Sequence, residues 1–357
     1  MRGLIVAGIV VGVLWIGLSP RLETVSFADP RLERAVRDAL HKPEGPLLHS
    51  DLLCLQDLSA VGLDIVRLDG IEYCRNLEAL DLAENRISDL GALAELTKLE
   101  SLILRSNLVE DVSPLAALAG LRKLDLDFNF VCDAKPLRGL TNLRWLGLWN
   151  SGIDDITPLA ALTELIELGL SGNPIEDFAP LSGLTRLEWL GLPNTGIRDL
   201  EVLSGLVNLV KLSLGGNRIV DLEPLRGLTN LEGLGLDSND ITDLSPLAGM
   251  VRLQRLSVWG NQIEDISSLE GLVRLEELWL DRNPISKIDV VAGFRELRIL
   301  GLSGTSISDL TPLVENAGLA SSDEIDLRDV AIEGPAIQNA VDQLRQRGVS
   351  VRTDPSE

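Results

Sequence analysis

Leucine recurs every 22 residues along most of the chain, and each recurrence opens the same pattern of apolar and polar positions. Within a unit the first, fourth and sixth positions are apolar, as at Leu231, Leu234 and Leu236. Because one variable residue separates the fourth position from the sixth, this stretch has the period of two that is typical of a β-strand with one buried face. Each unit therefore predicts one short strand. The twelve units begin at Leu55, Leu77, Leu99, Leu121, Leu143, Leu165, Leu187, Leu209, Leu231, Leu253, Leu275 and Leu297.

The second half of each unit is too short for a full α-helix with its flanking turns. Because proline fits the first turn of a helix but not its interior, a recurring proline here predicts one turn of 3₁₀ or α-helix. Stacked units of this kind predict an α/β solenoid, with parallel strands on its concave side and the short helical turns on its convex side. The recurring prolines are Pro114, Pro136, Pro158, Pro180, Pro224, Pro246 and Pro312.

Two polar columns run through the array. Asparagine at the ninth position is expected to bond backbone groups of its own turn and the next, because an unpaired buried group costs about 1–3 kcal/mol. Aspartate at the thirteenth position is expected to cap the helical turn that follows. A calcium site along the aspartates is the weaker alternative, since one column brings few oxygens together. The columns are Asn85, Asn107, Asn129, Asn173, Asn217, Asn239, Asn261 and Asn283, and Asp89, Asp111, Asp133, Asp155, Asp177, Asp199, Asp221, Asp243, Asp265 and Asp309.

These residues at these spacings resemble leucine-rich repeats of the 22-residue, internalin-like type, which is also seen in phosphatase regulators. The flanking stretches "FADPRLERAVRDAL" and "NAGLASSDEIDLRDVAIEGPAIQNAVDQLRQRGVSV" are similar to the caps of bacterial members. The resemblance implies a leucine-rich repeat horseshoe and a role in recognition, but it implies no particular ligand.

The sequence predicts four parts in the chain. Residues 1–28 are expected to be a signal peptide or an N-terminal membrane anchor, because Gly3–Leu18 carries no charge. Residues 29–54 form a helical N-terminal cap that starts at Asp29 and Pro30. Residues 55–318 are the twelve repeats, and residues 319–357 form a C-terminal cap of strand, helix and strand.

We expect the protein to be exported. It is either cleaved after Ala28 and then secreted or periplasmic, or it stays anchored in the membrane without cleavage; a cytoplasmic protein is the remaining alternative. The odd number of cysteines leaves at least one thiol free. Cys54 and Cys74 lie on adjacent turns and could pair, or the cysteines could be small buried residues.

The net charge of −22 makes nucleic acid an unexpected partner. No cofactor and no metal site is predicted. Enzymatic activity is not expected either, because His41 and His49 both precede the array and an open strand face excludes little water. The argument for catalysis is limited to neighbouring carboxylates near aromatic residues, which glycosidases also use.

Candidate binding residues lie at the third, fifth and seventh positions of each unit, whose side chains leave the strand on the concave side. Five of the six tryptophans occupy these columns, and tryptophan is enriched where proteins bind partners. The favoured function is an exported, monomeric module that binds a protein. Alternatives are a carbohydrate-binding surface protein, an intracellular phosphatase-type regulator, and rings that only stabilise the sheet. The predicted ligand-binding residues are Trp145, Trp149, Glu167, Trp189, Trp259, Trp279, Asp125 and Asp127.

Overall fold

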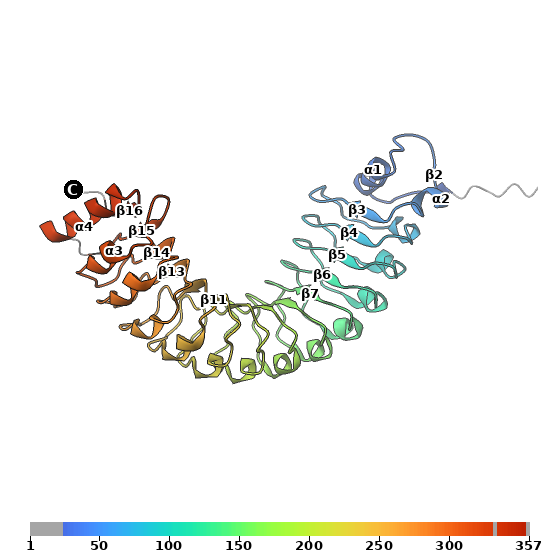
Figure 1. Cartoon of the computed structure of the whole chain (residues 1–357). Coiled ribbons are helices and arrows are strands. Elements are labelled where there is room, and N and C mark those ends of the chain that lie inside the picture. The colour runs from blue at the N-terminus through green and yellow to red at the C-terminus, as the bar shows by residue number, and fades with distance from the viewer. Residues whose placement is uncertain (1–23, 331–333, 355–357) are drawn as a thin grey trace, which may run out of the picture.

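The computed structural model describes residues 24–330 and 334–354. The chain curves into an arc whose inner side carries the strands and whose outer side carries short helical turns (Figure 1). The predicted α/β solenoid with a horseshoe shape is therefore confirmed. The apolar segment 3–18 lies outside the described residues. Among the residues that are described, no helix combines the length and the apolar character needed to cross a bilayer.

One parallel sheet lines the concave side, and each strand pairs in register with the equivalent strand one repeat further along. The fourth-position leucines, such as Leu146 and Leu168, are fully buried behind the sheet. Within the described residues the sheet has 14 strands. They are β3 (Asp57–Ser59), β4 (Ala79–Asp81), β5 (Ser101–Ile103), β6 (Lys123–Asp125), β7 (Trp145–Gly147), β8 (Glu167–Gly169), β9 (Trp189–Gly191), β10 (Lys211–Ser213), β11 (Gly233–Gly235), β12 (Arg255–Ser257), β13 (Glu277–Trp279), β14 (Ile299–Gly301), β15 (Glu324–Asp326) and β16 (Ser350–Arg352).

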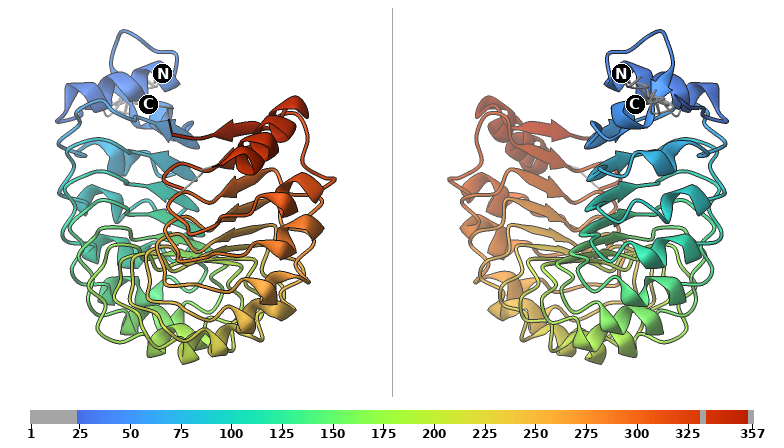
Figure 2. Two further views of the ribbon diagram at one scale, coloured as in Figure 1. Left: turned by 90° about the vertical axis from the view of Figure 1, so that its left-hand side faces the viewer. Right: turned by 90° about the vertical axis from the view of Figure 1, so that its right-hand side faces the viewer.

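Short helical turns cover the convex side, as Figure 2 shows from both ends of the arc. Most are 3₁₀ helices, and several have the recurring proline in their first turn as predicted. The twelfth repeat instead forms an α-helical turn, α3 (Thr311–Glu315). The 3₁₀ helices are η1 (Ile71–Tyr73), η2 (Gly91–Leu93), η3 (Ser113–Ala117), η4 (Lys135–Gly139), η5 (Thr157–Ala161), η6 (Ala179–Gly183), η7 (Glu201–Leu203), η8 (Glu223–Leu225), η9 (Ser245–Gly249), η10 (Ser267–Leu269) and η11 (Asp289–Gly293).

The asparagine column is buried and bonds successive turns together. Asn173 Oδ1 accepts hydrogen bonds from the amides of Ser151, Gly152 and Ile153, at 2.9–3.1 Å. Its Nδ2 donates to the carbonyls of Leu148 at 2.6 Å, in the preceding repeat, and of Leu170 at 2.8 Å. Each asparagine of this kind satisfies backbone groups that the bend would otherwise leave unpaired, which confirms the predicted structural role.

The aspartate column bonds the amide at the start of each convex turn. Asp155 Oδ1, for example, accepts from the amide of Thr157 at 2.8 Å. The same bond, two residues along the chain, occurs at all ten aspartates of the column. In the part of the chain that the structure describes, no three carboxylate, histidine or cysteine side chains are grouped as a metal site would require.

A helical cap closes the N-terminal end of the array. The helix α1 (Pro30–Ala39) follows Asp29, whose carboxylate accepts from the amides of Arg31 and Val66, each at 2.9 Å. Ahead of α1, β1 (Thr24–Val25) pairs antiparallel with β2 (Leu47–Leu48), which leads into α2 (His49–Leu52). Val25 and Phe27 are buried in the core, so the described cap includes residues before position 28.

At the other end, α4 (Pro335–Gln346) packs its apolar face against the last turns, and β16 adds the final strand. Gly348 follows α4 with a φ of +88°, a left-handed conformation that favours glycine. All three cysteines are free: Cys74 is buried, and Cys54 and Cys132 are exposed. Burial raises the pKa of the Cys74 thiol to about 12.

Candidate recognition surface on the concave face

The five tryptophans of the concave columns are all half-buried, with part of each ring open to solvent. They form two clusters. The first cluster is Trp145, Trp149 and Trp189 on and beside β7 and β9, and the second is Trp259 and Trp279 near the C-terminal cap. Their strands are fixed by the buried leucine columns, so the rings stand on a rigid sheet.

Glycines form the floor beneath the first cluster. A methyl group built on Gly147 would lie 2.7 Å from Trp145 Cη2, and one on Gly191 would lie 2.8 Å from Trp189 Cη2. One on Gly169 would collide with Trp149 Nε1, because that ring crosses β8. The rings therefore occupy space that only glycine leaves open.

The Trp149 ring reaches across β8 and stacks on Trp189, with 6.1 Å between ring centroids and 28° between ring planes. The Lys123 ammonium lies over the Trp145 ring, 5.0 Å from its centroid. Glu167 pairs in register between Trp145 and Trp189 and is exposed. The first cluster thus combines aromatic faces with one cation and one accessible carboxylate.

Asp125 and Asp127 lie beside this cluster but are almost completely buried, with 9% and 6% of their surface exposed. Asp125 Oδ1 accepts from the Asp127 amide at 3.1 Å, and Asp127 Oδ1 accepts from the Trp149 amide at 2.8 Å. Burial raises the pKa of both carboxyls, that of Asp127 to about 6, and the neighbouring Asp125 charge adds to the shift at Asp127. Both carboxylates are therefore bonded mainly to backbone amides of the scaffold and offer little surface to a ligand.

A groove of about 390 Å³ joins the two clusters. Trp189 borders it at one end and Trp279 at the other, and Lys211 and Arg255 lie along it. Its floor is β11, where Gly233 and Gly235 leave no side chain on the concave side beyond hydrogen. The sequence places these glycines in the concave columns, but it does not show that Trp189 and Trp279 border one groove.

A second hollow, of about 410 Å³, lies between the second cluster and the C-terminal cap. Trp259 and Trp279 line it together with Asp281 and residues of β14 to β16. The Arg282 guanidinium lies over the Trp259 ring, 5.3 Å from its centroid. Asp281 was not among the predicted ligand-binding residues. Several charged residues occupy the concave columns, and nothing in the sequence distinguishes Asp281 from the others.

Comparisons with known proteins agree with this geometry. The family described as Leucine Rich repeats (2 copies) matches residues 75–117, 185–227, 207–249, 229–271 and 251–293. The solved structure of an internalin from Listeria monocytogenes is 30% identical, with a TM-score of 0.74, over 87% of this chain and 96% of that one. The chain belongs to the internalin-like leucine-rich repeat proteins of bacteria.

Two further solved structures share the fold with this internalin-like protein. The functional domain of InlJ from Listeria monocytogenes is 20% identical, with a TM-score of 0.63, over 87% of this chain and 68% of that one. A plant peptide hormone receptor, RGFR1 in complex with RGF2, is 21% identical, with a TM-score of 0.64, over 81% of this chain and 53% of that one. None of the curated protein sequences matches the chain.

The internalin-like fold is that of a recognition scaffold, and leucine-rich repeat proteins of this kind serve as interaction modules. The structure brings Trp149 and Trp189 into contact and places Glu167 and Trp145 beside them. Trp259 and Trp279 lie apart from that group; Trp279 borders the same groove as Trp189, and both line the hollow beside the C-terminal cap.

Proposed function

We propose that this internalin-like protein is an exported, non-enzymatic recognition module that binds a protein partner on its concave sheet through the two tryptophan clusters. The observation that carries the proposal is the stacked, half-exposed pair Trp149 and Trp189, fixed above a glycine floor. Side chains that are already held in place lose little conformational freedom on binding, so their buried area contributes more to affinity. Tryptophan also has few rotors for the area it buries.

The size and charge of the surface favour a protein as the partner. Both clusters border one groove, and Lys211 and Arg255 alternate there with Glu232 and aromatic faces. Mixed charges around aromatic residues are typical of protein interfaces, where charge pairs determine specificity. Export is proposed from the uncharged run Gly3–Leu18.

A carbohydrate is the second candidate ligand, because the six-membered rings of Trp145 and Trp189 lie against Gly147 and Gly191 and both side chains are partly exposed. Glu167, exposed between them, could accept hydrogen bonds from sugar hydroxyls. If soluble oligosaccharides displace the natural ligand, the carbohydrate hypothesis is correct and the hypothesis of a protein partner is wrong. The third candidate, an intracellular phosphatase-type regulator, requires that cell fractionation find the protein in the cytosol alone.

The test is partner capture with the whole chain immobilised on a solid support. Extracts of the protein's own cells and of neighbouring cells are passed over the native chain and over a variant with Trp145→Ala, Trp149→Ala and Trp189→Ala. We expect a partner that the native chain retains and the variant loses. Equal retention by both chains would place recognition outside the first cluster.

A control variant removes exposed apolar side chains from outside the concave columns. Val207, Val251 and Val273 are each about half exposed in the turns that lead from the convex helices to the next strands, and the control variant changes all three to alanine. This variant is expected to retain the partner. Both variants must melt within a few degrees of the native chain, so that lost binding reports the surface and not unfolding.

A further inference from the structure

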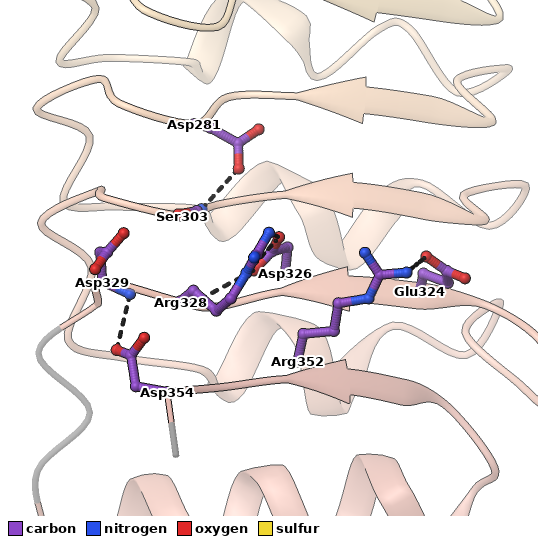
Figure 3. Close-up of polar contacts among 8 residues, drawn as sticks. All are labelled: Asp281, Ser303, Glu324, Asp326, Arg328, Asp329, Arg352 and Asp354. Atoms are coloured by element: carbon purple, nitrogen blue, oxygen red, sulfur yellow. Dashed lines mark hydrogen bonds and ion pairs between the residues drawn. The ribbon is translucent and has the colours of Figure 1, made fainter. Parts of the chain in front are cut away.

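The hollow of about 410 Å³ at the C-terminal end of the concave sheet combines aromatic walls with acidic groups. Trp259 and Trp279 form one side, Gly301 and Ile299 lie at the floor, and residues of β15 and β16 form the far side. Figure 3 shows the polar side chains of this region.

Most charges in this region are already paired. The Arg352 guanidinium donates to Glu324 Oε2 at 2.7 Å. The Arg328 guanidinium donates to both oxygens of Asp326, with Nε at 2.9 and 3.1 Å. Asp281 differs, because no basic side chain forms a hydrogen bond or ion pair with it in the described part of the chain.

The Asp281 carboxylate is 9% exposed and lies directly above Gly301, so a methyl group built on that glycine would collide with Oδ2. Oδ1 accepts from the Ser303 amide at 2.9 Å, and Figure 3 shows the other oxygen directed away from Ser303. Burial raises the pKa of Asp281 and the charge of Asp326 adds to that shift, while backbone amides of Ser303 and Asp281 and the Arg328 charge oppose it. A buried carboxylate that no basic side chain contacts is unfavourable unless a further donor or a cation meets its second oxygen.

Asp237 occupies the same position two repeats earlier and shows how the repeat can satisfy this second oxygen. On the strand after Asp237 the facing residue is Ser257, whose hydroxyl donates to Asp237 Oδ1. On the strand after Asp281 the equivalent residue is Gly301. The internal donor is therefore missing at Asp281, where the side chain lines an open hollow that two indole rings border on one side.

We propose that this hollow is a subsite for an arginine side chain of the protein partner, whose guanidinium bonds to Asp281 and lies against Trp259 and Trp279. A guanidinium is planar, stacks on indole faces and offers donors in a fixed fork, so one group satisfies both the carboxylate and the aromatic walls. The subsite rests on the proposed function, because it assigns part of the partner's chemistry to one place on the same concave face.

The test uses N-acetyl-arginine N-methylamide as the probe and the whole chain as the receptor. The indole N–H resonances of Trp259 and Trp279 are followed by NMR during titration at constant ionic strength. We expect the native chain to bind the probe, and Asp281→Asn to bind it at least tenfold more weakly. The uncharged analogue, N-acetyl-citrulline N-methylamide, should cause no comparable shift. Equal binding by Asp281→Asn, or equal binding of the citrulline analogue, would overturn the subsite.

Asp237→Asn is the matched control, since it removes the same charge from the same column but from a carboxylate that Ser257 already satisfies. It should bind the probe as the native chain does; an equal loss in both variants would reduce the effect to the overall negative charge and overturn the proposal. If Asp281→Asn does not fold, Trp279→Leu replaces it and should also lose the probe. Unchanged probe affinity in a folded Trp279→Leu variant would contradict the proposal.

This experiment and partner capture can fail independently. Asp281-dependent probe binding, together with a partner that the first-cluster variant still retains, would keep the subsite and refute the proposed role of that cluster. Loss of the partner from that variant, together with Asp281-independent probe binding, would keep the proposed function and refute the subsite.

Discussion

Replacing Asp127 by asparagine should change how the stability of the protein depends on pH. The side chain is 6% exposed, and burial raises its pKa from 3.8 to about 6. A group whose folded pKa is above its unfolded pKa binds more protons in the folded state over the interval between them. The free energy of unfolding of the native chain therefore falls as pH rises through that interval, and this contribution is absent from Asp127→Asn.

The magnitude follows from the difference between the two pKa values. At about 1.4 kcal/mol for each pH unit, a rise from 3.8 to about 6 corresponds to about 3 kcal/mol, most of which develops between about pH 4 and pH 7. Asparagine keeps an oxygen that can accept from the Trp149 amide. If its new amide group finds no acceptor, the variant loses about 1–3 kcal/mol more at every pH, so the test is the change of stability with pH and not the absolute difference.

The assay is urea unfolding of both chains at closely spaced pH values between about 4 and 8. The unfolding free energy of Asp127→Asn should rise relative to the native chain by about 3 kcal/mol over that range. Asp155→Asn is the control, because bonds from Thr157 lower the pKa of Asp155 below its ordinary value of 3.8. Its contribution to stability is lost only below that pH, so the difference between Asp155→Asn and the native chain should stay constant over the assayed range. Parallel stability curves for Asp127→Asn and the native chain would refute the assignment of a strongly raised pKa.

Two further substitutions test the scaffold and the floor of the first cluster. Asn173→Ala should lower the unfolding free energy, measured by urea unfolding, by at least about 3 kcal/mol, because it leaves several buried backbone groups unpaired. The control Asn208→Ala breaks one exposed hydrogen bond and should lower the unfolding free energy by no more than about 1 kcal/mol. Gly169→Ala should displace the Trp149 ring and change the near-ultraviolet circular dichroism, while Gly183→Ala, where an added methyl group meets nothing within 4 Å, should leave that spectrum unchanged.

Much of the fold can be predicted from the sequence, because the same residue type recurs at each conserved position of the repeat and its structural role there can be inferred. Period-two leucines predict the strands, and Leu146 and Leu168 are fully buried as that pattern requires. The role of Asn173 follows from the need to satisfy backbone groups at a bend, and its six polar contacts bear that out. Each of these inferences depends only on neighbours one turn away, which the fixed period places without ambiguity.

The arrangement of the site depends on information that the period does not contain. Trp149 and Trp189 belong to different columns and to strands that are not adjacent, so their contact depends on side-chain rotamers and on the open space above Gly169. The pairing of β1 with β2 was also not predicted, because strands of two residues leave almost no sequence pattern. Asp281 was not predicted as a site residue for a related reason. Its burial and the lack of a side-chain donor to its second carboxylate oxygen depend on which residue faces it one repeat later.

Some columns of the repeat stabilise the scaffold and others vary, and this separation explains how the protein tolerates unfavourable groups on its concave face. In a solenoid each repeat is stabilised mainly by its own packing and by its two neighbours, so a local cost is not transmitted along the array. Leucine, asparagine and aspartate columns supply that stability in every repeat, which leaves the third, fifth and seventh positions free to vary. Buried carboxylates such as Asp127 and Asp281 are destabilising there, and the stability of the scaffold allows the concave face to retain them. At Asp237, in the same column, the hydroxyl of Ser257 donates to the carboxylate and lowers this cost.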